Sequence, residues 1–155
     1  MIKKKLLKNA KKIDQFLINF LKKQKTSLLV KPMKYGVISG GKKIRSTIIF
    51  DTGKIFNIKE KKLLNICAAV ECVHSYSLIH DDLPCMDNDT VRRGKPAAHI
   101  KFGEAPAVLA GSSLLTLAFE IISDKKYSLN FRHKNEIVRS LASCSGHTGI
   151  AGGQD

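Results

Sequence analysis

The chain has 155 residues, and 27 Lys and Arg against 13 Asp and Glu give it a formal net charge of +14. Since 43% of its residues are hydrophobic, it can bury the core of one domain, which excludes a disordered polycation. The longest weakly polar run, 105–122, is interrupted by Gly, Ser and Glu residues. A bilayer span needs about 20 apolar residues, so we expect no transmembrane segment.

The positive charge is concentrated in the first part of the chain. Residues 1–62 contain 17 Lys and one Arg against three acidic residues, whereas residues 63–155 contain nine basic and ten acidic residues. Such a concentration suits a nucleic acid, a membrane surface or simply a solvated face. Because surfaces that bind nucleic acid favour Arg and aromatic residues, which are few here, we favour the solvated face and expect no nucleic-acid partner.

The cysteines and the N-terminus indicate the compartment. The four cysteines form no CxxC pair, so neither a zinc site nor a thioredoxin-like motif is supported. No secretory signal is visible, because the first lysines are not followed by an uninterrupted apolar stretch. We therefore expect reduced thiols and a cytoplasmic protein.

Helical periodicity dominates the first 60 residues. Apolar residues recur at steps of three, four and seven over Leu6–Leu21, which predicts an amphipathic helix with lysines on its other side. Such a helix lies on a membrane surface or, more often, packs on its own domain. A linker is expected over Thr26–Lys31, then a short helix opened by Pro32 and ending near Ser39, and a third helix over Lys42–Phe56.

Helices also dominate the rest of the chain. Asn57 and Glu60 have the spacing of a capping box that would open a long helix, which Pro84 stops. Residues 85–104 are rich in turn-forming residues, and two further helices are predicted over 107–122 and 133–145. The predicted fold class is all-α.

Four carboxylates follow the long helix within nine residues: Asp81, Asp82, Asp87 and Asp89. Carboxylates at a helix C-terminus oppose the helix dipole and repel one another, a cost that a bound cation commonly offsets. Oxygen ligands alone suit a hard ion such as Mg²⁺ or Ca²⁺, although the spacing is not that of an EF-hand. Taken alone, the cluster is equally compatible with an acidic surface turn.

Two cationic segments flank this cluster in the sequence. In Gly40-Gly41-Lys42-Lys43-Ile44-Arg45, two glycines precede a helix N-terminus, an arrangement that suits phosphate but is also common in plain turns. In Val91-Arg92-Arg93-Gly94-Lys95-Pro96, the cations can bind phosphate or pair with the neighbouring Asp residues. His74 precedes Asp81 by two helical turns, so it lies close to the same face of the long helix.

These segments together resemble the trans-isoprenyl diphosphate synthases, also called the polyprenyl synthetase family. The run from Ala69 to Pro96, AVECVHSYSLIHDDLPCMDNDTVRRGKP, closely resembles the first aspartate-rich region of that family, and most of all that of bacterial farnesyl diphosphate synthases. The segments Tyr35–Arg45, Lys101–Ala105, Leu109–Gly111 and Gly152–Gln154 resemble other motifs of the family. The resemblance covers nearly the whole chain.

The resemblance implies a fold and a set of site residues. The fold is the isoprenoid-synthase helical bundle, here truncated, with residues 1–155 forming the N-terminal part of a single domain. Asp81 and Asp87 would be catalytic and would hold Mg²⁺, with Asp82 as a helper. Arg92 would contact the allylic diphosphate. Isopentenyl diphosphate would be bound by four residues: Lys42, Arg45, His74 and Arg93.

The resemblance also implies a reaction. It is the condensation of isopentenyl diphosphate with dimethylallyl or geranyl diphosphate to give farnesyl diphosphate, carried out by a homodimer when the protein is complete. The aromatic Tyr76, five residues before Asp81, is typical of farnesyl-producing members. The alternatives are a geranylgeranyl diphosphate synthase, a non-catalytic partner of a full-length synthase, and a polycation that binds nucleic acid.

The chain departs from the family pattern at two points. Ser46 stands where the family usually has Pro, which we expect to have a small effect at the helix start. The second aspartate-rich motif is absent, so we expect that the chain is cut short and that these 155 residues alone have little synthase activity.

Overall fold

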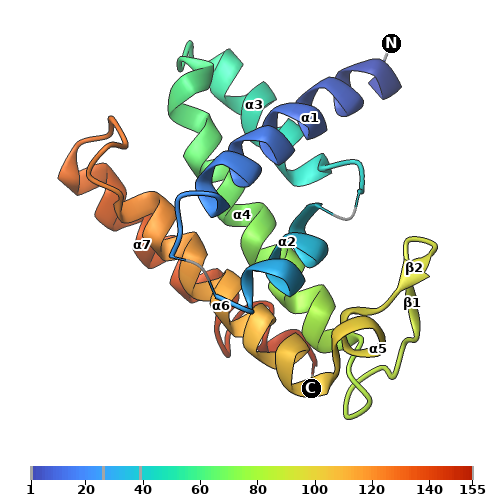
Figure 1. Ribbon diagram of the computed structural model, residues 1–155. Coiled ribbons are helices and arrows are strands. Elements are labelled where there is room, and N and C mark those ends of the chain that lie inside the picture. The colour runs from blue at the N-terminus through green and yellow to red at the C-terminus, as the bar shows by residue number, and fades with distance from the viewer. Residues whose placement is uncertain (1, 26, 39, 155) are drawn as a thin grey trace.

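Helices joined by short connections make up most of the computed structural model, which describes residues 2–25, 27–38 and 40–154 (Figure 1). The described helices are α1 (Ile2–Leu21), α2 (Val30–Ile38), α3 (Ile44–Ile55), α4 (Glu60–Asp81), α5 (Ala98–Phe102), α6 (Glu104–Ser123) and α7 (Phe131–Ser145). Two short strands, β1 (Val91–Arg92) and β2 (Lys95–Pro96), pair antiparallel, and Gly152–Gln154 form a 3₁₀ turn. The predicted all-α class is confirmed.

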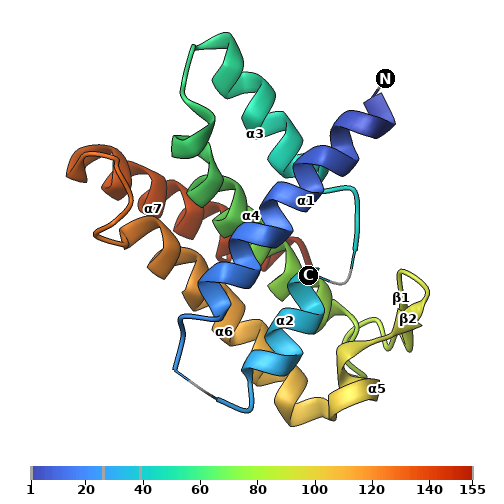
Figure 2. The same ribbon diagram turned by 45° about the horizontal axis from the view of Figure 1, so that its top comes forward.

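The long helix α4 is the centre of the fold. It packs against α1, α2, α3 and α6, and its contact with α6 is the most extensive (Figure 2). Its buried residues point in several directions, since Leu63, Cys67, Ala68 and Val73 are all buried. The helix is therefore a core element whose C-terminal end is held in place from several sides.

Small residues allow α4 and α6 to approach closely. A Cβ atom added at Gly111 of α6 would clash with the imidazole of His80 on α4. The His80 Nε2 atom also lies 3.0 Å from the carbonyl oxygen of Val108, one turn earlier on α6. Because α6 has no side chain at this crossing, the end of α4 that carries the acidic cluster lies directly on it.

The amphipathic helix α1 packs within the domain. Ile13, Leu17 and Leu21 are almost completely buried, whereas the lysines of the opposite face are exposed or half-buried. The side chain of Asn9 donates a hydrogen bond to the Thr47 hydroxyl of α3 over 3.2 Å. The apolar stripe found in the sequence is thus buried against the protein itself.

The capping box predicted at Asn57 is wrong. Asn57 has a φ angle of 54°, and the N-cap of α4 is Lys59, whose side chain makes no capping hydrogen bond. The amide of Asn57 donates to the carbonyl of Lys54, and the next amide, that of Ile58, donates to the carbonyl of Gly53. A left-handed Asn is a common way to end a helix, so Asn57 closes α3 instead of opening α4.

Several predicted boundaries move by a few residues. The expected linker ends earlier, because α2 begins at Val30, and α6 begins at Glu104 with Pro106 in its first turn. Residues 85–104, expected to be turns, include the β1–β2 hairpin and α5. Thr26 and Ser39, at the expected start of the linker and end of the short helix, lie outside the described residues.

By length and composition α6 is apolar enough to cross a membrane, and no other described helix is. Core helices of globular proteins pass the same test. Ala107, Ala110, Leu114 and Ile121 of α6 are almost completely inaccessible to solvent. Packing in the core, mainly against α4, therefore accounts for part of the apolar character of α6.

All four cysteines are free in the structure. Burial raises the pKa of both Cys67 and Cys72 to about 12, so these two thiols stay protonated and act as small apolar side chains.

Candidate functional site

Four of the predicted binding residues line a single cavity. Its volume is about 930 Å³, and Lys42, Arg45, His74 and Arg93 all contribute to its wall. The remaining lining comes from the start of α1, the segment before α3, and α4: Ile2, Lys3, Leu6, Leu7, Gly41, Lys43, Ile44 and Glu71. Cations and apolar side chains therefore surround one space, which suits an anion that carries an apolar group.

The segment before α3 takes a backbone shape that only a few residues allow. Gly40 and Gly41 have φ angles of 95° and 104°, and Lys43 has a φ angle of 46°. Such angles favour glycine, and they turn the chain sharply into the first turn of α3. Lys42 and Arg45, three residues apart, are consequently exposed on the cavity side of this turn.

Arg93 connects the β1–β2 hairpin to this segment. Its guanidinium donates a hydrogen bond from Nη1 to the Gly40 carbonyl oxygen over 2.6 Å. A Cβ atom at Gly41 would lie 2.7 Å from the same nitrogen, so Gly41 leaves room for the arginine. Two cationic segments that are 53 residues apart in the sequence thus meet on one side of the molecule (Figure 1).

His74 is uncharged at neutral pH. Burial lowers its pKa to about 4, helped by the positive charges of Arg45, Arg93 and Lys43 and opposed by Glu71. A neutral imidazole in a cationic cavity can donate one hydrogen bond to an anion without adding to the repulsion among the cations. It can also take up a proton when an anion binds.

Asp81 and Asp87 come together although five residues separate them. The chain after α4 turns back on itself, so that the Asp87 amide donates to the Asp81 carbonyl oxygen over 2.8 Å. Burial and the nearby Asp87 charge raise the pKa of Asp81, and a hydrogen bond from the Gln154 side chain opposes the rise. Gln154 belongs to the last described segment, which returns to the end of α4 (Figure 2).

Asp82 and Arg92 form a separate ion pair. Asp82 is only 3% exposed, and the Arg92 guanidinium donates to its Oδ1 atom, from Nε over 2.9 Å. Arg92 also lies 3.3 Å from the Asp89 carboxylate. The interpretation of Arg92 as a partner of neighbouring Asp residues therefore holds in this structure, and Asp82 faces the arginine.

Asp81 and Asp87 suit a Mg²⁺ ion that keeps part of its water shell, and they do not form a metal site made entirely of protein ligands. Among residues 2–25, 27–38 and 40–154, no group of three or more His, Cys, Asp or Glu side chains is placed to hold a metal ion. Mg²⁺ commonly takes one or two carboxylates and completes its shell with water and substrate phosphate. Asp81 and Asp87 are two neighbouring carboxylates that solvent can reach, which matches this pattern of Mg²⁺ binding. The raised pKa of Asp81 shows that its negative charge is disfavoured, and a bound cation would stabilise that charge.

The carboxylate pair and the cationic cavity lie along the same helix. His74 and Asp81 are seven residues apart on α4, which corresponds to about 10 Å along its axis. Asp81, Asp87 and Arg92 do not contribute to the lining of the cationic cavity. The predicted residues therefore form two neighbouring groups. Of the two consecutive hairpin arginines, Arg93 lines the cationic cavity, and Arg92 pairs with Asp82, the residue after Asp81.

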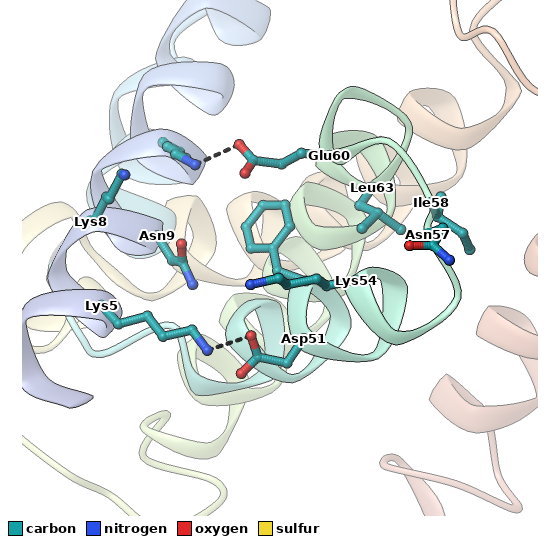
Figure 3. A pocket seen from close by; sticks show the side chains of 11 residues that line it. Lys5, Lys8, Asn9, Asp51, Lys54, Asn57, Ile58, Glu60 and Leu63 are labelled. Carbon is teal, nitrogen blue, oxygen red and sulfur yellow. Dashed lines mark hydrogen bonds and ion pairs between the residues drawn. The ribbon is translucent and has the colours of Figure 1, made fainter. Parts of the chain in front are cut away.

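A second cavity lies between α1 and the ends of α3 and α4 that meet there (Figure 3). It has a volume of about 460 Å³ and four lysines, of which Lys5 pairs with Asp51 and Lys12 pairs with Glu60. These two carboxylates neutralise two of the four lysines, and their ion pairs connect α1 to α3 and α4. The cavity contains none of the predicted site residues.

Sequence reasoning missed two contributions to the cationic cavity. Ile2 and Leu7 of α1 lie off the buried stripe of that helix, and their exposure, 74% and 55%, is unusual for large apolar residues. Glu71 is a lone acidic residue on an otherwise apolar part of α4 and is only 2% exposed. An isolated carboxylate in an apolar helix was the signal that could have identified it.

Comparison with known proteins gives a consistent result. The family model described as "Polyprenyl synthetase" matches residues 26–154. The chain is 49% identical over 127 residues to the farnesyl diphosphate synthase of Escherichia coli strain K12, covering 81% of this chain and 42% of that enzyme. It is 45% identical over 141 residues to the farnesyl diphosphate synthase of Buchnera aphidicola from Acyrthosiphon pisum, covering 90% and 50%.

A solved structure extends the similarity to three dimensions. The crystal structure of an FPP/GFPP synthase from Zymomonas mobilis superposes with a TM-score of 0.93 at 41% identity, covering 99% of this chain and 56% of that one. The chain thus spans about half the length of the relatives it matches, and over that half it has the same fold.

Proposed function

The chain belongs to the polyprenyl synthetase family, and on this premise we propose that it serves the condensation of isopentenyl diphosphate with an allylic diphosphate to give farnesyl diphosphate. The observation that carries the proposal is the pair of neighbouring sites along α4. One is a cationic cavity, and the other is a carboxylate pair about 10 Å away. Two diphosphates bound at these sites would lie side by side, as a reaction between them requires.

The cationic cavity suits isopentenyl diphosphate. Lys42, Arg45 and Arg93 supply charge to the diphosphate, His74 supplies a hydrogen bond, and Leu6 and Leu7 supply apolar surface for the carbon chain. The uncharged state of His74 keeps the cavity from carrying one more positive charge before the anion arrives.

The carboxylate pair suits the allylic diphosphate together with Mg²⁺. Asp81 and Asp87 would hold the metal, which supplies stabilisation of the negative charge that grows on the departing diphosphate. Arg92, positioned by Asp82, would contact the same diphosphate.

In the complete enzyme we expect Asp81→Ala to reduce turnover by several orders of magnitude while the free energy of unfolding changes little, because repulsion with Asp87 is relieved.

Product length is part of the proposal. The Tyr76 ring packs edge-on against the imidazole of His80, with ring centroids 4.9 Å apart, and is partly buried against the core. We propose that Tyr76 limits the growing chain to the farnesyl length, and that a geranylgeranyl product is the alternative. Tyr76→Ala in the complete enzyme should shift the product from C15 towards C20, whereas an unchanged C15 product at normal rate would contradict this role.

The partners and the compartment follow the same premise. We propose that the complete protein acts as a homodimer in the cytoplasm. A non-catalytic role as the partner of a full-length synthase is the alternative. Co-purification of these 155 residues with a full-length homologue, without any binding of isopentenyl diphosphate by the chain alone, would favour that alternative.

Calorimetric titration with isopentenyl diphosphate tests the central proposal on the chain itself. We expect saturable binding that Lys42→Ala weakens at least tenfold, since an ammonium lost from a phosphate contact commonly costs about 1.5 kcal/mol or more. Lys34→Ala is the matched control, because Lys34 is an exposed lysine of α2 outside the cavity lining. Equal weakening by both variants would reduce the interaction to general charge attraction and contradict the proposal.

A further inference from the structure

Lys43 differs from the cations that surround it. Its side chain is only 3% exposed, whereas Lys42 and Arg45 on either side are exposed. The left-handed backbone at Lys43 turns the chain between these residues, so that the Lys43 side chain runs beneath the cavity while its neighbours stay on the surface. A lysine in this position is not free to bind an incoming anion with its ammonium.

The buried ammonium is held from three helices. The Lys43 Nζ atom donates a hydrogen bond to the carbonyl oxygen of Val37 on α2 over 2.6 Å. It lies 3.6 Å from the Glu71 carboxylate of α4 and 3.8 Å from the Asp14 carboxylate of α1. One side chain thus ties the segment before α3 to α1, α2 and α4.

Glu71 holds the other side of the same turn. Its Oε1 atom accepts hydrogen bonds from the Ser46 hydroxyl over 2.8 Å and from the Ser46 amide over 3.3 Å, while its Oε2 atom faces Lys43. Ser46 directly follows Arg45 in the first turn of α3. The carboxylate therefore fixes the backbone on both sides of the segment that carries Lys42 and Arg45.

Burial of an ion pair is weak evidence for stability, because removing two charges from water offsets most of their attraction. The contacts of Lys43 and Glu71 are better explained by a role in fixing the position of the backbone before α3. We propose that Lys43 and Glu71 are positioning residues, which set the backbone of residues 42–46 so that Lys42 and Arg45 face the cationic cavity. This inference rests on the proposed function, since it assumes that the cavity binds a diphosphate.

Two charge-removing substitutions test the proposal. In the 155-residue chain, Glu71→Gln and Lys43→Met should each weaken the binding of isopentenyl diphosphate and of inorganic pyrophosphate at least tenfold. Neither side chain donates to the ligand in this arrangement, so the loss arises from a displaced backbone. Lys43→Arg keeps the charge and should retain affinity within about threefold.

A destabilised control separates position from stability. Leu117→Ala removes a buried side chain of α6, far from this segment in sequence, and should lower the melting temperature without changing the affinity for pyrophosphate. If Glu71→Gln and Lys43→Met lowered the melting temperature as Leu117→Ala does and kept the parent affinity, the positioning role would be overturned. Should either variant fail to fold, Ser46→Ala removes only a hydroxyl and should still weaken binding.

The cavity variants distinguish the two proposals. If Lys42→Ala weakens binding and Glu71→Gln, Lys43→Met and Ser46→Ala do not, the positioning inference alone fails. If the parent chain binds neither isopentenyl diphosphate nor pyrophosphate, the proposed function fails, and the positioning role falls with it.

Discussion

His74 makes the stability of the fold depend on pH in a defined direction. Its pKa is about 4 in the folded chain and about 6.5 in an unfolded one, so the unfolded state binds the proton first as the pH falls. The contribution of neutral His74 is fully present above pH 6.5 and is lost progressively between pH 6.5 and pH 4. The cause is burial, reinforced by Arg45, Arg93 and Lys43.

Unfolding by urea at pH 7.5 and pH 5.0 measures this effect. We expect the free energy of unfolding of the parent chain to fall by about 1–2 kcal/mol more than that of His74→Gln between the two values. Asp14 and Asp81 have raised pKa values and act in the opposite direction, but they are present in both chains and cancel in the difference. An equal pH dependence in both chains would contradict the buried neutral state.

Two adjacent glycines offer a matched comparison. Both have φ angles that side chains rarely adopt, so alanine at either position strains the backbone by about 1–3 kcal/mol. Only at Gly41 does the added Cβ atom meet Arg93, since nothing lies within 4 Å of such an atom at Gly40. Gly41→Ala should therefore weaken pyrophosphate binding in calorimetry more than Gly40→Ala does, and the difference should disappear when Arg93→Ala is present in both chains.

The contact between α4 and α6 can be tested at one crossing point. A methyl group at Gly111 would displace the His80 imidazole and separate the two helices, a change that typically costs about 1–3 kcal/mol in a packed core. Thermal unfolding of Gly111→Ala should show this loss. Ser112→Ala, at the exposed next position of α6, should leave the melting temperature within experimental error.

Helices with strong periodicity could be predicted from the sequence. The stripe on α1 and the apolar run in α6 appear as expected, since these patterns report burial directly. Asn57 could not be assigned in the same way, because its residue type serves equally well to begin a helix or to end one. The α3 hydrogen bonds that decide the matter involve Gly53 and Lys54 and have no sequence signature of their own.

The division of the site residues into two groups was predicted through the family resemblance, and the residue types and their spacing alone did not indicate it. Arg92 and Arg93 are adjacent in sequence and chemically identical, yet one pairs with Asp82 and the other reaches the Gly40 carbonyl. Their separation depends on the hairpin, whose two-residue strands are too short to show alternation. Glu71 was missed because motifs are recognised from the spacing between several residues, and Glu71 is a single acidic residue.

At the scale of the whole molecule, one face of α3 remains uncovered. Ile48 and Ile55 are 60% and 76% exposed. They are seven residues apart, which is about two helical turns, so their side chains point in directions that differ by only about 20° around the helix axis. Exposed apolar surface of this kind favours association. We expect a chain of these 155 residues to form concentration-dependent oligomers.

Light scattering after gel filtration measures that association. The double substitution Ile48→Gln and Ile55→Gln should shift the chain towards the monomer without lowering its melting temperature. Lys34→Gln, which alters a surface lysine of α2, should leave the oligomers unchanged. Monomeric behaviour of the parent chain at all accessible concentrations would contradict the expectation.

The hydrogen bond between Arg93 and Gly40 also bears on the order of events during folding. Closing a flexible loop of 53 residues costs roughly 3.5 kcal/mol or more of chain entropy, whereas each helix forms from local contacts within microseconds. We therefore expect the hairpin to dock after α3 and α4 have paired, so that the cationic cavity is completed late. Refolding followed in time should show helical signal and amide protection in α4 before the chain regains its affinity for pyrophosphate.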